Sequence, residues 1–148
     1  MEYNIKKLSP TDIDLARQLI QLWNEQDQIE DPPVPSEPYL SNLLSTEGFH
    51  VYAAVWEGKL IGGLTAYELA MFKEEIKEMF LYEIGVHEQY QQKGIAKSLI
   101  QELKKACDQK GIKIIFVGTS MDNLAAQQLY AGTGGGREDI PWYTYELG

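Results

Sequence analysis

Hydrophobic and polar residues along this chain follow two different periods, and these periods predict where strands and helices form. Alternating or β-branched runs predict strands over Tyr3–Leu8, Phe49–Trp56, Lys59–Leu69, Glu78–Val86, Ile112–Val117 and Trp142–Leu147. Apolar residues at three- or four-residue spacing predict helices that end near Gln26, span Tyr39–Ser45 and Gly94–Gln109, and begin after Asn123. No repeat or linker interrupts the series, so we predict a single domain over residues 1–148.

The connections between these elements determine the class of sheet. Glu57-Gly58 lies between two predicted strands and is typical of a two-residue hairpin, which joins antiparallel strands. The strand–helix–strand segment from Glu78 to Val117 is a crossover, which joins parallel strands. We therefore expect an α/β (α+β) fold with a mixed, mostly antiparallel sheet flanked by helices.

Composition narrows the class of protein. A net charge of −9 argues against nucleic acid as a partner, because a phosphate backbone attracts Lys and Arg. No apolar run approaches the roughly 20 residues that span a bilayer, and no secretory signal is visible at the N-terminus. The single cysteine, Cys107, suits a reducing compartment, so we expect a cytoplasmic protein. The two histidines have no metal-ligand spacing, so we expect no metal.

Acidic residues gather in one interval of the chain. Between Arg17 and Lys59 there is no lysine or arginine, and the interval holds Glu25, Asp27, Glu30, Asp31, Glu37, Glu47 and Glu57. An acidic loop attracts polycations and steers them into a cleft, and aminoglycosides and polyamines are such molecules. We predict that Glu30 and Asp31 contact a cationic substrate; the alternative is a solvated acidic loop.

The turn between the strand ending at Val86 and the following helix is the best candidate for a binding site. It contains Gln91-Gln92-Lys93-Gly94-Ile95-Ala96, and the first amides of the helix have no partner within it. Such amides, together with the helix dipole, favour an anion. The alternative is a strand-to-helix connection that binds nothing.

The order of elements and this turn, with the pattern Gln91-x-x-Gly94-x-Ala96, resemble the Gcn5-related N-acetyltransferase superfamily. Leu81–Val86 resembles the family's fourth strand, and Asn123–Tyr130 resembles its later helix motif. The resemblance implies the acyl-CoA N-acyltransferase fold, with a sheet that splays at a central parallel strand pair. It also implies acetyl-CoA as the donor and a possible homodimer.

Several segments resemble more narrowly the aminoglycoside 3-N-acetyltransferases that modify gentamicin-type drugs. These segments are Gly63–Leu69, Tyr82-Glu83, Gly94–Ala96 and Leu129-Tyr130. Ser120 stands where that subgroup has an acidic residue that meets the drug, and we expect the nearby Asp122 to take its place.

The resemblance assigns the donor site residue by residue. The amides from Gln92 to Ala96 would hold the pyrophosphate, and the backbone of Ile84 to Val86 would pair with the pantetheine like an added strand. The full set of predicted donor-binding residues is Ile84, Gly85, Val86, Gln91, Gln92, Lys93, Gly94, Ile95, Ala96, Lys97, Asn123 and Tyr130.

Two residues are candidates for proton transfer. By resemblance Tyr130 donates a proton to the leaving thiolate, since a phenol of pKa ~10 can protonate a thiolate of pKa ~8.5. Glu83 is the first candidate for the base that accepts the amine's proton, with Glu78, Glu68 or a water as alternatives. Strict alternation would place Glu83 and Leu81 on one face of the strand.

These observations predict an enzyme that transfers the acetyl group of acetyl-CoA to a primary amine of a small polycation, most simply an aminoglycoside. The attack would be direct and would pass through a tetrahedral intermediate. Alternatives are the same chemistry on a polyamine, amino acid or peptide amine, and a non-catalytic acyl-CoA-binding module.

Overall fold

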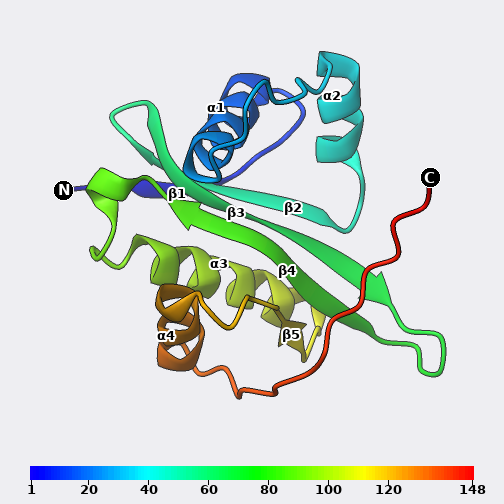
Figure 1. The fold of residues 1–148 in the computed structure, drawn as a ribbon. Helices are drawn as coiled ribbons and strands as arrows, with labels where there is room; N and C mark the ends of the chain where they lie inside the picture. The colour runs from blue at the N-terminus through cyan, green and yellow to red at the C-terminus, as the bar shows by residue number, and fades with distance from the viewer. The chain divides into compact units, whose positions relative to one another are not determined.

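The computed structural model describes residues 1–148 and shows the predicted alternation of strands and helices (Figure 1). Residues Met1–Gly118 form one unit and Thr119–Gly148 form a second. The first unit contains β1 (Asn4–Lys7), α1 (Ile13–Gln26), α2 (Glu37–Ser45), β2 (Phe49–Trp56), β3 (Lys59–Ala70), β4 (Lys77–Val86), the 3₁₀ helix η1 (Glu88–Tyr90), α3 (Ile95–Lys110) and β5 (Ile115–Phe116). The second unit contains α4 (Leu124–Gly132).

The five strands form one mixed sheet in the order β1-β2-β3-β4-β5. Strands β1 to β4 are antiparallel to their neighbours, and β5 runs parallel to β4. The hairpin between β2 and β3 turns at Glu57 and Gly58, whose φ angles of 50° and 75° are those of a tight primed turn. The predicted class of sheet is therefore confirmed.

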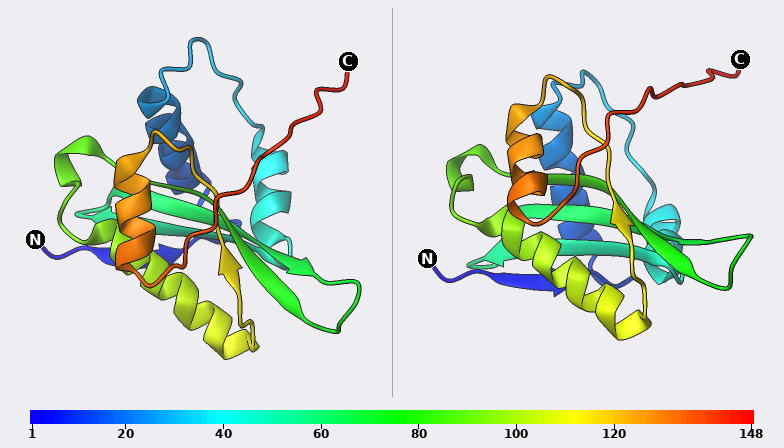
Figure 2. Two further views of the ribbon diagram at one scale, coloured as in Figure 1. Left: turned by 60° about the horizontal axis from the view of Figure 1, so that its bottom comes forward. Right: turned by 90° about the horizontal axis from the view of Figure 1, so that it is seen from below.

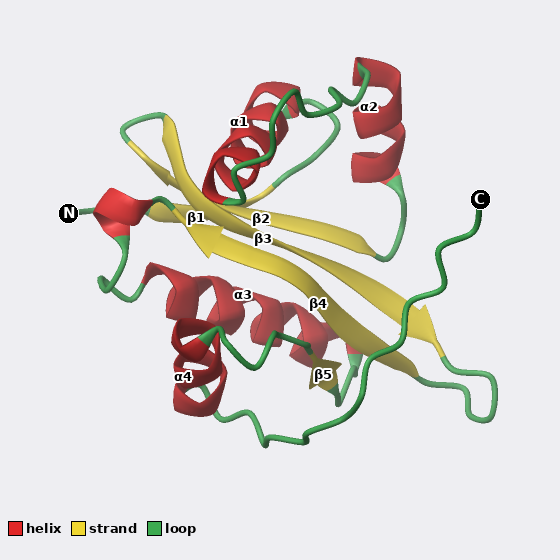
Figure 3. Ribbon diagram, in the orientation of Figure 1, coloured by secondary structure: helices red, strands yellow, loops and turns green.

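Two predicted strands differ from the structure. The strand expected over Ile112–Val117 is reduced to Ile115–Phe116, which pair with Met79 and Phe80, and Phe116 is 39% exposed. The strand expected over Trp142–Leu147 does not form, and this segment is drawn as loop in Figure 3. Because no strand lies beyond β5, the parallel pair is at one edge of the sheet rather than at its centre.

Helices cover both faces of the sheet in the first unit. Figures 1 and 2 show α1 and α2 on one face and α3 on the other. On the α1 side, apolar side chains from α1, β2 and β3 form a core that includes Leu19, Leu22, Val51 and Leu60. The α3 side chains Ile95, Leu99, Leu103 and Cys107 are also buried, at the helical spacing seen in the sequence.

Close contact between α1 and the sheet requires glycine at one position of β3. A β-carbon placed on Gly63 would lie 2.8 Å from Leu19 Cδ2 and 2.8 Å from the Tyr52 carbonyl oxygen. Any larger residue there would push α1 away from the sheet.

A buried carboxylate joins three strands and a helix at one end of α3. Glu68 of β3 accepts hydrogen bonds from His50 Nε2 of β2 (2.5 Å), Lys77 Nζ of β4 (3.3 Å) and Lys110 Nζ of α3 (2.7 Å). Burial alone would raise the pKa of Glu68, but the hydrogen bonds and charge of Lys110, with those from His50 and Lys77, lower it to about 2. Burial lowers the pKa of His50, whose Nδ1 has no partner, so the imidazole is neutral and donates from Nε2.

The Glu68 cluster makes stability depend on pH. Because its pKa is lower in the folded chain than the ordinary 4.5, Glu68 stabilises the fold above about pH 4.5, and this stabilisation is lost as pH falls toward 2. Glu68→Gln should lower the free energy of unfolding by about 2 kcal/mol at pH 7 and by much less near pH 2. Urea unfolding across this range tests it, with the exposed Glu47→Gln as the control. An equal loss at both pH values would contradict the assignment.

Candidate active site

The second half of β4 has an unpaired backbone edge. Strand β5 pairs with β4 only at Met79 and Phe80, whereas β3 pairs with β4 along its length to Val86. The N–H of His87 donates to the Ile61 carbonyl at 2.8 Å. Since alternate residues of a strand direct their backbone groups to the same side, Ile84 and Val86 direct theirs away from β3. This edge can accept an extended chain as an additional strand.

A β-bulge changes which residues of β4 share a face. Thr65 pairs with Glu83 and Ala66 pairs with Leu81, so Tyr82 is an extra residue in β4. Leu81 is buried in the core, with 2% of its surface exposed. Glu83 is solvent-accessible, and the negative charge of Asp27 at the end of α1 helps to raise its pKa. The prediction that Leu81 and Glu83 share a face is therefore wrong, because it assumed unbroken alternation.

Gly85 is required by packing between β4 and α1. A β-carbon placed on Gly85 would lie 2.6 Å from Trp23 Nε1 and 3.1 Å from Gln26 Oε1. The indole nitrogen of Trp23 is itself buried without a hydrogen-bond partner. Gly85 therefore lets the end of α1 approach β4 closely, and its backbone groups face β3 rather than the open edge.

The predicted turn before α3 has the geometry of an anion-binding loop. Gln92 and Gly94 have left-handed φ angles of 59° and 80°, and no side chain caps α3. Left-handed residues alternating with right-handed ones turn successive amides toward a common concave side. A β-carbon placed on Gly94 meets no atom within 4 Å, so the backbone is open to close approach. These features fit a pyrophosphate.

The remaining predicted donor-binding residues contribute in different ways. The side chain of Ile95 is 1% exposed in the core, so only its backbone amide can face a ligand. Lys93 and Lys97 are exposed beside the turn. Gln91 Nε2 donates to the Val86 carbonyl at 3.0 Å, which ties the turn to the end of β4.

Glu83 is the carboxylate on β4 best placed to accept a proton. Partial burial, followed by the negative charge of Asp27, raises its pKa above the ordinary value. Glu68 is a poor alternative base because three cationic or hydrogen-bonding partners lower its pKa to about 2. Glu78 pairs with Leu69 near the start of β4, on the other side of the bulge from Glu83.

The second unit carries the predicted acid. Asn123 is the N-cap of α4, and its side-chain oxygen accepts from the Ala126 N–H at 3.0 Å. Tyr130 lies in the last turn of α4, and burial raises the pKa of its phenol. The phenol therefore remains protonated at neutral pH and can donate. Asp122, just before the N-cap, is exposed.

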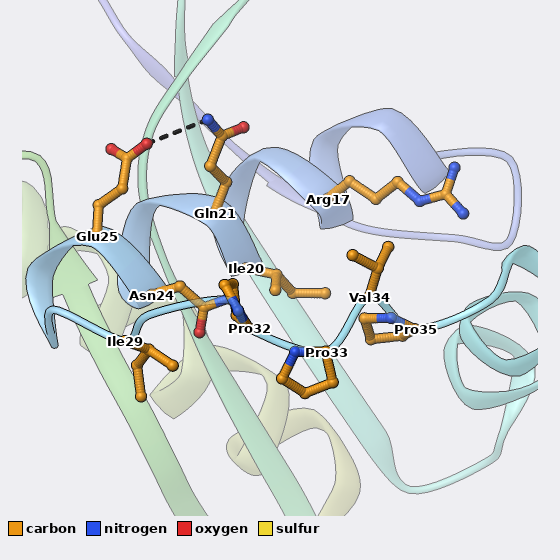
Figure 4. Close-up of a pocket in the computed structure, with 10 residues that line it drawn as sticks. All are labelled: Arg17, Ile20, Gln21, Asn24, Glu25, Ile29, Pro32, Pro33, Val34 and Pro35. Carbon is orange, nitrogen blue, oxygen red and sulfur yellow. Dashed lines mark hydrogen bonds between the residues drawn. The ribbon is translucent and has the colours of Figure 1, made fainter.

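The loop after α1 holds the predicted substrate carboxylates Glu30 and Asp31, which are both exposed. Its apolar residues Ile29 and Val34, with neighbouring prolines, pack beside Ile20 of α1 around a cavity of about 440 Å³. Arg17 and Glu25 stand at opposite ends of this cavity, and Gln21 donates to Glu25 at 3.1 Å (Figure 4). No residue of the turn or of β4 lines it, so the cavity is separate from the β4 edge.

Sequence reasoning missed three residues at the end of α1: Trp23, Gln26 and Asp27. Asp27 is the loop carboxylate whose charge acts on Glu83, and Gln26 Nε2 donates to the Val86 carbonyl at 2.8 Å. Asp27 was visible as part of the acidic interval. Nothing in the sequence could signal the contacts of Trp23 and Gln26, because they depend on how α1 crosses β4.

Comparison with known proteins identifies the family. The model of the acetyltransferase (GNAT) family matches residues 16–134. The chain belongs to this family. The chain is therefore an acetyl-CoA-dependent N-acetyltransferase, as the sequence predicted. No protein of curated function matches the chain.

Three of the solved structures that are similar to this chain are aminoglycoside acetyltransferases. One is meta-AAC0020 from an uncultured soil metagenomic sample, in complex with sisomicin: it is 27% identical, with a TM-score of 0.94 over 99% of this chain and 97% of that one. HMB0005, from a similar sample, is 29% identical, with a TM-score of 0.94 over 100% of both chains. AAC(6')-Iy, in complex with a bisubstrate analogue, shares the fold at 22% identity and a TM-score of 0.80, over 99% of this chain and 100% of that one.

Two further observations concern the whole chain. None of its helices combines the length and apolar character needed to cross a membrane. No group of three His, Cys, Asp or Glu side chains is close enough to hold a metal ion.

Gly94→Val should weaken donor binding without unfolding the chain. The new side chain would enter the open space in front of the turn, so we expect the Kd for acetyl-CoA to rise at least ~10-fold. Calorimetric titration measures this. Gly111→Val is a matched control, since Gly111 has a φ of 69° and open space at the other end of α3. Equal effects of both variants on Kd would show that backbone strain, not ligand contact, is responsible.

Proposed function

We propose that this enzyme transfers the acetyl group of acetyl-CoA to a primary amine of an aminoglycoside. The observation that carries the proposal is the likeness, at a TM-score of 0.94, to an aminoglycoside acetyltransferase in complex with sisomicin. The acidic interval after Arg17, free of lysine and arginine up to Lys59, supports a polycationic substrate. The narrower resemblance to gentamicin-modifying enzymes makes the 3-amino group the proposed position.

The chain would hold the donor by its backbone. The amides of the turn from Gln92 to Ala96 receive the pyrophosphate, and the open backbone groups of Ile84 pair with the pantetheine, up to the Val86 N–H. Lys93 and Lys97 add positive charge beside the turn. Bound in this way, acetyl-CoA supplies a thioester whose acetyl carbon can accept a nitrogen lone pair and release a thiolate.

Two side chains would move the protons. Glu83 accepts a proton from the substrate ammonium, which frees the nitrogen lone pair to attack the acetyl carbon directly. The carbon–sulfur bond then breaks, and Tyr130 donates its phenolic proton to the sulfur. The Val86 N–H, on the open edge, stabilises the negative charge that develops on the acetyl oxygen. The nitrogen loses its second proton to the Tyr130 phenolate, so the amine ends as an amide, Tyr130 is regenerated, and no covalent enzyme intermediate forms.

Carboxylates around the loop after α1 would bind the other ammonium groups of the substrate. Glu30 and Asp31 are exposed on this loop, and the prolines that follow them limit its freedom. We assign Asp27 to the same group of substrate-binding carboxylates because its charge already acts on Glu83. Asp122, before α4, is a further substrate contact in this proposal.

We also propose that the two units act together as one domain and that the enzyme is a cytoplasmic homodimer. Large apolar side chains in the last residues, Ile140, Trp142, Tyr143, Tyr145 and Leu147, are 67–92% exposed, which favours self-association. The free, buried Cys107 suits a reducing compartment. Sedimentation velocity should give twice the chain mass of 16.8 kDa, and a monomer at micromolar concentration would contradict the dimer.

Thiol release from acetyl-CoA, measured with a panel of amines, tests the proposed function. We expect turnover with gentamicin-type aminoglycosides, with NMR of the product showing acetylation of the 3-amino group.

Tyr130→Phe should lower kcat by ~10²-fold with little change in unfolding temperature, and the exposed Tyr143→Phe is its control. Turnover only with polyamines, amino acids or peptides would reassign the substrate. Binding of acetyl-CoA without turnover of any amine would favour a binding module.

The raised pKa of Glu83 predicts a pH dependence of catalysis. A base must be deprotonated, so kcat should fall as pH decreases through the pKa of Glu83. Asp27→Asn removes a charge that raises this pKa, so the acidic limb should move to lower pH. The control is Glu25→Gln on the cavity side of α1. If Asp27→Asn leaves the limb in place, the group that titrates is not Glu83.

A further inference from the structure

Three hydrogen bonds hold one peptide group at the end of β4. The Val86 carbonyl accepts from Gln26 Nε2 at 2.8 Å and from Gln91 Nε2 at 3.0 Å. The N–H of the same peptide group, that of His87, donates to the Ile61 carbonyl of β3 at 2.8 Å. Both lone pairs of the carbonyl and the single N–H are therefore occupied by groups of the protein.

These bonds come from three different parts of the fold. Gln26 is the last residue of α1, Gln91 belongs to the turn before α3, and Ile61 lies in β3. Val86 is also the last residue of β4, and β5 pairs with β4 only at Met79 and Phe80. Without the two amides, the Val86 carbonyl would lie at an unpaired edge, and only the His87 N–H bond to Ile61 would hold this peptide group.

The orientation of this peptide determines the direction of the neighbouring N–H. The Val86 N–H belongs to the preceding peptide group, whose carbonyl, that of Gly85, faces β3. With the peptides on both sides of the Val86 α-carbon fixed, its N–H points to the open edge in one direction. A donor held in advance stabilises developing charge more strongly than one that must first reorient.

We propose that Gln26 is a positioning residue for acetyl transfer, which acts by holding the Val86–His87 peptide so that the Val86 N–H faces the acetyl group. This inference rests on the proposed function. Gln26 is adjacent to Asp27, whose charge acts on Glu83, so the end of α1 would serve both the base and the backbone donor.

Gln26 differs from Gln91 in a way that makes the proposal testable. Gln91 belongs to the turn that would hold the pyrophosphate, so its loss would also weaken donor binding. Gln26 lies outside that turn, at the end of helix α1. Its removal should therefore affect kcat far more than the KM for acetyl-CoA.

The test compares Gln26→Ala and Gln26→Glu with the wild type and with Gln21→Ala. Gln26→Glu keeps the shape but places an acceptor against the Val86 carbonyl, so it cannot donate at neutral pH. The control residue, Gln21, lies on the same helix and contacts Glu25 rather than β4. We expect kcat to fall about 10-fold in both Gln26 variants, with KM for acetyl-CoA within about 2-fold and Gln21→Ala unchanged.

A second readout does not require turnover. The ¹⁵N–¹H signal of His87 reports on the peptide group whose carbonyl Gln26 holds, so it should shift in both Gln26 variants and not in Gln21→Ala. An unmoved His87 signal, or an unchanged kcat in an active wild type, would overturn the proposal. A change confined to KM would also overturn it. If the wild type acetylates no amine, the proposed function fails, whereas the His87 signal still tests the contact.

Discussion

The divergence of β5 from β4 is the constraint on which the site depends. A strand inside a sheet satisfies its backbone groups on both sides, but β4 has a parallel neighbour only at Met79 and Phe80. Its remaining length is held on one side by β3, while the other side is open. The bulge at Tyr82 lies where this open edge begins, and it turns Glu83 toward the end of α1. The open edge and the reoriented carboxylate are therefore consequences of one irregular strand.

Two glutamates on adjacent strands show how the same side chain acquires opposite properties. Glu68 on β3 is surrounded by Lys77, Lys110 and His50, which keep its carboxylate charged and make it part of the scaffold. Glu83 on β4 has no such cation and lies near another carboxylate, so its proton affinity is raised. A general base needs a pKa high enough to accept a proton, whereas a carboxylate in a structural ion pair must stay deprotonated. The neighbours of each carboxylate in the structure therefore distinguish Glu68, a stabilising residue, from Glu83, a candidate base, which the sequence alone does not do.

The donor and acceptor sides of the site are built on different parts of the fold. In the proposed function the donor is held by backbone amides and an open strand edge, which vary little when side chains change. This is consistent with a TM-score of 0.94 at only 27–29% identity. In the proposed function the acceptor is bound by carboxylates on the loop after α1, where side chains decide what is bound. Membership of the GNAT family therefore identifies the donor, whereas the acceptor must be argued from charge and from the related structures.

The sequence by itself determined the order of the elements, the mixed sheet, the turn around Gly94 and the family, because periodicity and glycine placement are local signals. It also singled out Glu83 and Tyr130. It failed for the strand expected over Trp142–Leu147, since a strand pattern does not create a pairing partner. Only the tertiary structure decided which face Glu83 occupies, because one inserted residue at Tyr82 reverses the alternation. Likewise only the packing of α1 on Gly85 brings Gln26 to the Val86 carbonyl and Asp27 near Glu83, contacts across about 60 residues of chain that no local pattern encodes.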